Sequence, residues 1–251
     1  MNADQYVAWV VGKYAVNAAS GSPASLAASQ LLPALESWAG RSLLGVQFSG
    51  SYAKHTAISL GTDVDLFLSL DSNEPVKNLY WSLFQFCVEQ RLQAQAQNVS
   101  IRVQSNGVNV DLVPGRKQQG NTEDHTLYRR KKNSWVQTNV AQHIRLIGNS
   151  GRTEEIRALK IWRERNRLDF PSFYLELTTL DALRYSRDQS LANRVWSVLQ
   201  YLASEFKQAR VIDPANSNNV ISDDLGPEEK REIAVAAEKC LMLRQWEQIL
   251  W

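Results

Sequence analysis

Residues 50–70 read GSYAKHTAISLGTDVDLFLSL, and the rest of the chain is organised around this stretch. It contains the pattern Asp63-Val64-Asp65, followed by a run of apolar residues. Because side chains alternate between the two faces of a strand, Asp63 and Asp65 are predicted to project to one side, about 7 Å apart. Two carboxylates at such a distance repel each other unless a cation lies between them. The pattern therefore indicates a cation site at the start of a strand over 63–70.

A glycine and a serine precede this pair of aspartates. Gly50 would let the backbone approach a phosphate group closely, and Ser51 offers a hydroxyl and an amide as donors. Mg2+ binds carboxylate oxygens together with substrate phosphates. A short helix is expected over 52–59, with its first amides directed at those phosphates. Two solvated aspartates on a surface strand would explain a bare Asp-x-Asp pattern, whereas the preceding Gly-Ser favours a metal and nucleotide site.

A third carboxylate follows in a predicted β-hairpin. Residues 99–104 and 108–113 both alternate in polarity, and an Asn-Gly pair lies between them. Such a pair is the strongest short-range signal for a tight hairpin turn. Asp111 is expected on the polar face of the second strand, which the Pro-Gly pair at 114–115 should end. With the two earlier aspartates, Asp111 makes a plausible two-metal carboxylate set.

The order of these motifs and of several later ones resembles a known family. The motifs are Gly50-Ser51, Asp63-x-Asp65, Asp111, Leu159-Lys160-Ile161-Trp162, the segment PSFYLEL at 171–177, Asp213-Pro214 and Asn218-Asn219-Val220. Together they resemble the cyclic GMP–AMP synthase-like nucleotidyltransferases (CD-NTases). That family is a branch of the polymerase-beta-like superfamily, related to the 2′-5′-oligoadenylate synthetases and the archaeal-type CCA-adding enzymes. The resemblance extends over residues 43–220, most of the chain.

The resemblance implies an α+β fold with two lobes and an active site in the cleft between them. Residues 1–125 would form the polymerase-beta-like nucleotidyltransferase lobe, a mixed sheet with helices. Residues 126–251 would form a helical lobe like the carboxy-terminal region of the oligoadenylate synthetases. The polar residues of 115–133 are expected to form a loop, whose basic run at 129–132 is solvated. The chain after residue 143 is expected to be wholly helical, with a loop over 210–226.

The resemblance also implies roles for the residues of the first lobe. Asp63 and Asp65 would hold two Mg2+ or Mn2+ ions, and Asp111 would hold one of them and accept the proton of the attacking hydroxyl. Gly50 and Ser51 would contact the triphosphate.

Three residues of the second lobe would complete the nucleotide site. Lys160 would lie exposed in the cleft and act as a point charge on the triphosphate, although a lone helical lysine is usually just solvated. Ser172 would contact phosphate, but its position after a proline also suits a helix N-cap. Asn219 would lie near the nucleotide, but it is also an ordinary turn residue.

The activity implied is a metal-dependent transfer that joins NTPs into a cyclic di- or oligonucleotide second messenger, with release of pyrophosphate, in bacterial antiphage signalling. ATP is the expected substrate, and the second base stays open. A linear 2′-5′-oligoadenylate product is an alternative, as are tRNA, small-molecule or protein nucleotidyl transfer. The CCA-adding alternative is weakened by the length of the chain, because that branch carries further tRNA-binding domains after the region matched here. A catalytically dead binding module is disfavoured because all three carboxylates are present.

The bulk composition places limits on compartment and cofactors. The chain has 251 residues, 44% of them hydrophobic, and a formal net charge of +2, which suits a globular protein with a sizeable core. Cys87 and Cys240 each lie in an apolar helical pattern and are expected to be buried free thiols in a reducing compartment, the cytoplasm. No membrane span, signal peptide or zinc site is expected.

The first 40 residues argue against an obligatory nucleic-acid cofactor. They contain one basic residue, Lys13, and the helix predicted over 23–39 contains none. Binding a nucleic-acid duplex requires several cations on one surface. The expected partners are therefore NTP substrates, and the enzyme is expected either to be constitutively active or to be switched by a regulatory protein or small molecule.

Overall fold

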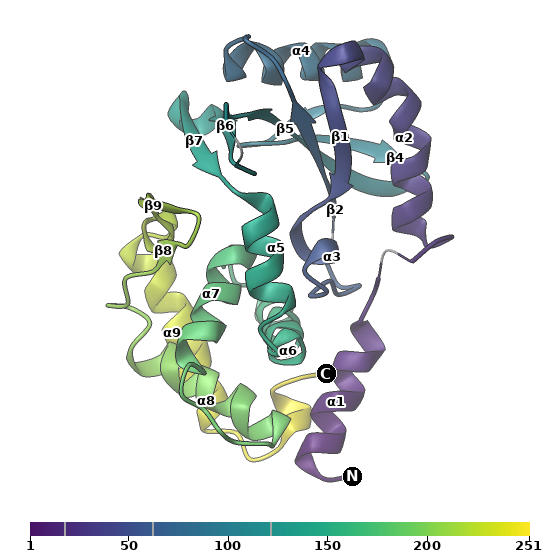
Figure 1. Cartoon of the computed structure of the whole chain (residues 1–251). Coiled ribbons are helices and arrows are strands. Elements are labelled where there is room, and N and C mark those ends of the chain that lie inside the picture. The colour runs from purple at the N-terminus through teal and green to yellow at the C-terminus, as the bar shows by residue number, and fades with distance from the viewer. Residues whose placement is uncertain (18, 62, 121) are drawn as a thin grey trace. The chain divides into compact units, whose positions relative to one another are not determined.

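The computed structural model describes residues 1–17, 19–61, 63–120 and 122–251, and it divides into two compact units (Figure 1). The helical unit comprises Met1–Val16, His55–Thr62 and Arg145–Trp251, and the sheet unit comprises Asn17–Lys54 and Asp63–Ile144. Each unit has its own hydrophobic core. The predicted α+β class, with one mixed sheet and a largely helical region, is confirmed.

In the part of the chain that the structure describes, the sheet unit is built on one seven-stranded sheet. Its strands are β1 (Leu43–Phe48), β2 (Val64–Leu70), β3 (Gln95–Ala96), β4 (Ile101–Ser105), β5 (Val108–Lys117), β6 (His125–Arg129) and β7 (Ser134–Thr138). The order is β1-β2-β5-β4-β3, with β6 paired to β5 and β7 paired to β6. β2 and β5 run parallel, whereas the other pairs are antiparallel, so the sheet is mixed as predicted.

Two helices cover the core of the sheet unit. α2 (Pro23–Ala39) has the predicted bounds and begins after Ser22, whose hydroxyl accepts the Ser25 amide at 3.2 Å. α4 (Val76–Glu89) buries Leu83 on the stripe that faces the core. Both helices pack against β4 and β5. The apolar stripes that the sequence shows at helical spacing are therefore what anchors these helices to the sheet.

β5 does not end at the Pro-Gly pair, so that prediction is wrong. The strand continues through Pro114 and Gly115 to Lys117. β4 pairs with β5 only as far as Leu112, so Pro114 breaks no ladder to β4. A Cβ on Gly115 would lie 2.4 Å from Cζ of Phe67, so the glycine leaves room for this ring on the neighbouring strand.

The prediction of a loop over 115–133 is also wrong. Residues of this region form β6 and, after the 3₁₀ turn η2 (Arg130–Lys132), lead into β7. Asn133 closes the turn in the left-handed region, with φ 43°. The basic run therefore lies at the exposed tip of a hairpin. The helix predicted over 52–59 is wrong in extent, because only the single turn α3 (Gly50–Ala53) forms.

The helical unit contains the remaining helices and a small hairpin. Its elements are α1 (Ala3–Tyr14), the end of α5 (Val140–Gly148), α6 (Thr153–Arg165), α7 (Ser172–Ala182), α8 (Leu191–Ser204), α9 (Pro227–Leu241), the strands β8 (Ile212–Asp213) and β9 (Asn216–Val220), η3 (Ile221–Asp224) and η4 (Trp246–Gln248). The β8–β9 hairpin makes the prediction of a wholly helical region wrong. Among the described helices, none is both long and apolar enough to cross a bilayer.

The two units are not contiguous in sequence, which differs from the division predicted at residue 125. α1 belongs to the helical unit, where Asp4 accepts hydrogen bonds from the Ser190 hydroxyl and the Ala192 amide, both at 2.8 Å. The segment after α3 joins the same unit, and Ile58 pairs with Ala15 as an isolated bridge. Contacts between residues far apart in sequence, such as the hydrogen bond from the Tyr6 hydroxyl to the Leu250 carbonyl 244 residues away, therefore define the helical unit.

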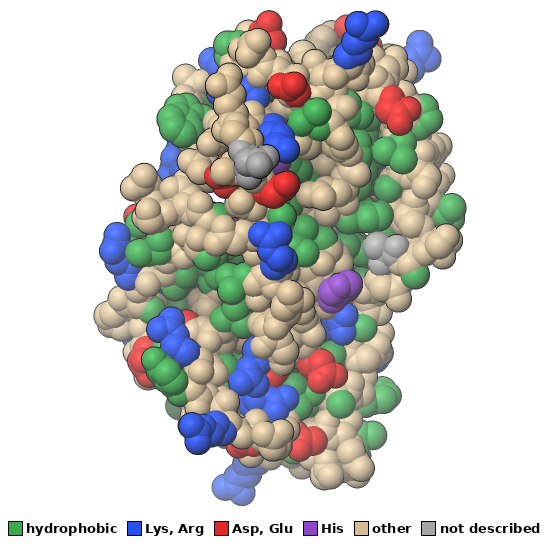
Figure 2. All heavy atoms as spheres, viewed as in Figure 1, with side chains coloured by type: hydrophobic (Ala, Val, Ile, Leu, Met, Phe, Trp, Pro, Cys, Tyr) green, Lys and Arg blue, Asp and Glu red, His purple; other side chains and the backbone are tan. Residues whose placement is uncertain are grey.

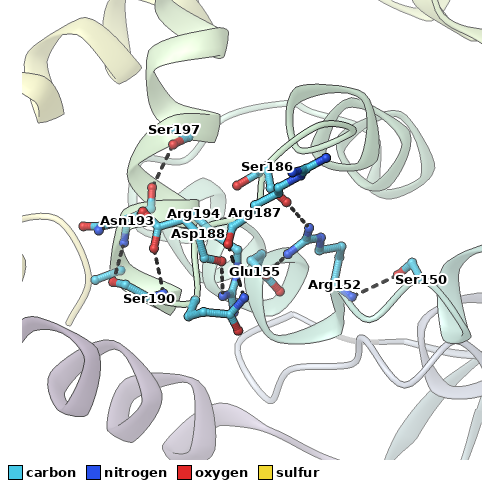
Figure 3. A network of polar contacts seen from close by, with 12 residues as sticks. Ser150, Arg152, Glu155, Ser186, Arg187, Asp188, Ser190, Asn193, Arg194 and Ser197 are labelled. Atoms are coloured by element: carbon cyan, nitrogen blue, oxygen red, sulfur yellow. Dashed lines mark hydrogen bonds and ion pairs between the residues drawn. The ribbon is translucent and has the colours of Figure 1, made fainter.

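A buried ion-pair network links α6 and α8 (Figure 3). Glu155 on α6 has a side chain only 1% exposed, and its Oε1 accepts from Arg194 Nε at 2.5 Å and from Arg152 Nη1 at 3.3 Å. Arg152 also donates to the Ser186 carbonyl, and Arg194 to the Asp188 carbonyl. A buried carboxylate needs such partners, because leaving it unpaired carries a large desolvation penalty.

Candidate active site

The parallel register of β2 and β5 brings two of the predicted carboxylates together. Asp65 lies directly opposite Asp111, so their side chains project from the same face of neighbouring strands, about 4.8 Å apart in backbone spacing. Both residues are half-buried, whereas Val64 and Leu66 on the opposite face are buried. The predicted alternation of β2 is therefore confirmed, and the spacing of the motifs does place Asp65 beside Asp111.

Asp63 lies one residue before β2, which begins at Val64 instead of at the predicted residue 63. Its carboxylate accepts a hydrogen bond from Arg102 Nη2, so Arg102 joins the cluster. Arg102 is directly opposite Asp111 in the β4–β5 register. Its Nε and Nη2 donate to Asp111 Oδ1 and Oδ2, both at 3.0 Å. The hydrogen bonds and charge of Asp111, together with the charge of Asp63, raise the pKa of the Arg102 guanidinium above its usual value.

Gly50 lies against the carboxylate of Asp65. Its φ is +55°, and a Cβ at this position would lie only 1.8 Å from Asp65 Oδ2. The preceding amide, of Ser49, donates to the Asp65 carbonyl at 2.8 Å and fixes this approach. Only glycine fits, for both the backbone conformation and the contact. Ser51 follows in α3, where it is half-buried.

The donor set of this cluster suits Mg2+ or Mn2+, because carboxylates supply hard oxygen ligands from β2, from β5 and from the residue before β2. Asp63, Asp65 and Asp111 are the residues that would hold such ions. Within the described ranges, however, no group of three acidic, histidine or cysteine side chains is gathered closely enough to hold a metal. Arg102 is engaged with two of the three carboxylates instead.

Lys160 is buried, so the prediction that it lies exposed is wrong. Its side chain is 2% exposed, and its Nζ donates to Glu176 Oε1 at 2.7 Å and to Thr56 Oγ1 at 2.9 Å. Thr56 in turn donates to the same Glu176 oxygen at 3.0 Å. The three side chains come from α6, α7 and the segment after α3, all within the helical unit. These contacts favour a structural role for the lysine.

Ser172 is exposed at the first position of α7. Its hydroxyl makes no capping hydrogen bond to the helix, so the N-cap alternative does not hold. It accepts instead from Arg163 Nη1 at 2.9 Å, and the same nitrogen donates to the Phe170 carbonyl at 2.8 Å. A hydroxyl next to a guanidinium is suited to a phosphate oxygen.

Asn219 lies in the β8–β9 hairpin and has a structural contact there. Its Nδ2 donates to Asp213 Oδ2 at 3.1 Å, while Asp213 Oδ1 accepts the Ala215 amide at 2.9 Å. Asp213 is buried, and these two hydrogen bonds offset the desolvation cost of its carboxylate. Asn219 therefore stabilises the turn.

The structure thus places the predicted residues in several environments. Gly50, Asp63, Asp65 and Asp111 form one cluster in the sheet unit, with Ser51 next in the chain. The three predicted residues of the helical unit lie on α6, on α7 and in the β8–β9 hairpin.

Arg102 is the member of the cluster that the sequence analysis missed. A two-residue Asn-Gly turn fixes the register on either side of it, so counting back from the turn pairs Arg102 with Asp111. The signal was therefore present in the sequence, although nothing in it marked this arginine as more than a solvated strand residue.

No protein-family model and no curated protein sequence matches the chain. Solved structures do match it. E. coli CdnC with ATP is 19% identical over 98% of this chain and 96% of its own, with a TM-score of 0.77. Bradyrhizobium diazoefficiens CdnG, a CD-NTase in complex with GTP, is 13% identical over 99% and 95%, with a TM-score of 0.78. Elizabethkingia meningoseptica CdnE, a cyclic dinucleotide synthase with GTP and Apcpp, is 14% identical over 94% and 97%, with a TM-score of 0.71. The family predicted from the motifs is thus confirmed at the level of the fold, and the chain has the fold of the CD-NTases.

Proposed function

We propose that the protein is a metal-dependent nucleotidyltransferase that joins NTPs into a cyclic di- or oligonucleotide second messenger, with release of pyrophosphate. We place this activity in bacterial antiphage signalling. ATP is the proposed substrate, and the second base stays open. One observation carries the proposal: Asp65 lies opposite Asp111, with Asp63 beside them and Gly50 against Asp65, on the fold of the CD-NTases.

The neighbours with this fold support the choice of substrate. CdnC was solved with ATP, CdnG with GTP, and Elizabethkingia CdnE with GTP and Apcpp. The Elizabethkingia protein is described as a cyclic dinucleotide synthase. A chain of the same fold that places Asp65 and Asp111 on adjacent strands, with Asp63 just before the first of them, is suited to the same class of reaction.

Each residue of the cluster would have a distinct task. Asp63, Asp65 and Asp111 would hold divalent ions, whose chemistry is to lower the pKa of a hydroxyl nucleophile and to neutralise charge on the triphosphate and pyrophosphate. Gly50 keeps the backbone beside Asp65 free of a side chain, so a phosphate can approach. Ser51 adds a hydroxyl and an amide donor for the same phosphate.

Two residues of the helical unit remain proposed nucleotide contacts. Ser172 is exposed beside the Arg163 guanidinium, whose Nε and Nη2 donate to Glu164 Oε1 at 3.1 and 2.7 Å. Asn219 is half-buried in the β8–β9 hairpin. Lys160 was predicted to bind the triphosphate as well, but its buried contacts with Glu176 and Thr56 support a structural role instead.

The proposed activity requires no nucleic acid. Figure 2 shows basic and acidic side chains on the same face, among apolar and other polar ones. Duplex binding needs several cations on one surface. A regulatory protein is the partner that we propose, since E. coli CdnC was also solved in complex with HORMA-deltaN.

The test is product formation by nuclease-treated enzyme. The protein is incubated with all four labelled NTPs and with Mg2+ or Mn2+, and the products that resist phosphatase are separated. Phosphatase-resistant oligonucleotides without free ends support a cyclic product, and products with a 2′-5′ linkage and a free terminus support the linear alternative. Transfer only to tRNA, to a small molecule or to a protein would contradict the proposal.

A further inference from the structure

Arg102 lies in one cross-strand row with two candidate metal ligands. It is opposite Asp111, which is opposite Asp65. Directly opposed residues of neighbouring strands project from the same face of a sheet, so the guanidinium is aimed at the carboxylates by the register itself. The position of Arg102 therefore follows from the hairpin and is not a chance contact of a long, flexible side chain.

The guanidinium engages two carboxylates at once. Both oxygens of Asp111 accept from it at 3.0 Å, in the bidentate geometry that Arg and carboxylate pairs favour, and Nη2 also donates to Asp63. The side chains of Arg102 and Asp63 are 30% and 32% exposed, and that of Asp111 is 13% exposed. The cluster is thus open enough to exchange partners, unlike a fully buried ion pair.

A divalent ion and this guanidinium would use the same oxygens. A metal ion binds the lone pairs of carboxylate oxygens, and the N–H groups of Arg102 already take up lone pairs on both oxygens of Asp111. Two cations at adjacent positions also repel each other, strongly so in a partly buried site. Divalent ions are therefore favoured only when Arg102 gives up part of its contact with Asp63 and Asp111.

We propose that Arg102 is a built-in competitor of the metal ions, a counter-ion that holds Asp63 and Asp111 in the metal-free protein and lowers the intrinsic affinity of the site for divalent metal. This inference rests on the proposed function, because it takes these carboxylates as the metal ligands. The consequence is that metal alone binds weakly. The negative charge of a bound triphosphate then favours loading of the site, which couples metal binding to substrate binding.

The experiment measures Mn2+ binding to nucleotide-free protein by electron paramagnetic resonance and calorimetry. Arg102→Gln removes the charge and the fork of donors, and we expect it to bind Mn2+ about tenfold or more tightly than the wild type. Its melting temperature should be lower than that of the wild type in EDTA and should rise more on adding Mn2+. Arg102→Lys keeps a charge but not the bidentate geometry, and should fall between the two.

The matched control is Arg41→Gln, which removes one positive charge from an exposed residue at the opposite end of β1 from Gly50. Its Mn2+ affinity should equal that of the wild type, which separates local competition from a change in net charge. Asp65→Asn is the second control. It should weaken Mn2+ binding both in the wild-type protein and when combined with Arg102→Gln.

The outcomes separate the inference from the proposed function. Unchanged or weaker Mn2+ binding by both Arg102 variants, with Asp65→Asn still impairing it, overturns the competition while leaving the metal site in place. Mn2+ binding that is insensitive to Asp65→Asn, or absent from every variant with and without NTP, overturns both. If Arg102→Gln does not fold, Arg102→Lys alone decides, because tighter binding than the wild type is required of it too.

Discussion

The Lys160 cluster of the helical unit and the Arg102 cluster of the sheet unit differ in their surroundings, although in each a basic side chain contacts partners from different segments of the chain. In the helical unit, Lys160 and Glu176 are 2% and 1% exposed and share Thr56 as a common partner. In the sheet unit, Arg102 and Asp63 are 30% and 32% exposed. Burial fixes the first cluster, because separating two desolvated charges carries a large penalty. The second can open to water, so it can exchange its cation for another.

The comparison shows that a charged residue is not assigned to a site by its type alone. A lysine in a family motif predicts a phosphate contact, yet here its partner is a buried glutamate. An arginine that no motif marks engages two of the predicted ligands. Exposure and partners decide which cluster is structural and which can do chemistry.

The largest effect on stability is expected from breaking the buried cluster. Lys160→Met leaves the Glu176 carboxylate buried without its ammonium, and we expect the free energy of unfolding to fall by about 3–5 kcal/mol. Urea denaturation measures this loss. The exposed Lys207 provides the matched control, since Lys207→Met should change stability by no more than about 0.5 kcal/mol.

A double variant sharpens this test. Lys160→Met combined with Glu176→Gln removes both charges, so it should recover part of the stability that the single variant loses. A Lys160→Met protein as stable as the wild type, but weaker in binding a non-hydrolysable NTP, would instead restore the exposed, phosphate-binding role that the sequence predicted for this lysine.

The second-largest effect is expected on catalytic activity, from a substitution beside Asp65 in the carboxylate cluster of the sheet unit. Gly50→Ala places a Cβ 1.8 Å from Asp65 Oδ2, so the carboxylate or the α3 turn must shift. We expect pyrophosphate release to fall by about 100-fold, since displacements of about 1 Å at a reacting centre have effects of this size.

Gly45 in β1 provides the control for this substitution, because a Cβ there would meet no atom within 4 Å. Gly45→Ala should keep near-wild-type turnover. Equal activity of the two alanine variants would mean that the contact between Gly50 and Asp65 has no part in catalysis.

The smallest effect is a pH dependence of stability that arises from a neutral buried group. His125 is buried in β6, where Nε2 lies 2.8 Å from Ser69 Oγ and Nδ1 lies 2.9 Å from the Glu123 carbonyl. Burial lowers the pKa of His125 below its usual value, against the opposing effects of the Glu123 carbonyl and the nearby acidic side chains. The folded state thus binds fewer protons than the unfolded state near the ordinary histidine pKa, about 6.5.

Stability that depends on neutral His125 is therefore present above about pH 6.5 and is lost as the pH falls below it. The free energy of unfolding of the wild type should decline more between pH 7 and pH 5 than that of His125→Gln, which cannot titrate. Parallel pH profiles for the two proteins would show that His125 contributes nothing to the acid sensitivity of the fold.

The local patterns of the sequence predicted much of the sheet unit and its cluster. Alternation predicted β2 and the face of Asp65, and the hairpin turn placed Asp111 on the next strand. Ser22 and the following proline predicted the first residue of α2 correctly. These features depend on neighbours within a few residues, which is why a sequence reveals them.

The features that the sequence did not reveal depend on distant partners. Lys160 is buried against Thr56, which lies 104 residues away in the sequence. No local pattern around the lysine could reveal this partner. α1 belongs to the helical unit because Asp4 contacts Ser190, 186 residues later. β6 was not predicted, because polar and basic residues surround it in the sequence, although its central Thr-Leu-Tyr segment has strand propensity.

We propose that the carboxylate row of β2 and β5 is the active site of a nucleotidyltransferase. The most direct measurement is pyrophosphate release from ATP and the other NTPs, with Mg2+ or Mn2+, by the wild type, Asp65→Asn and Asp111→Asn, each checked for folding by circular dichroism. We expect both variants to keep the fold and to lose turnover by more than about 100-fold, because each removes a ligand of the metal ions that would neutralise the charge developing on the phosphate. Turnover close to that of the wild type in both folded variants would contradict the account.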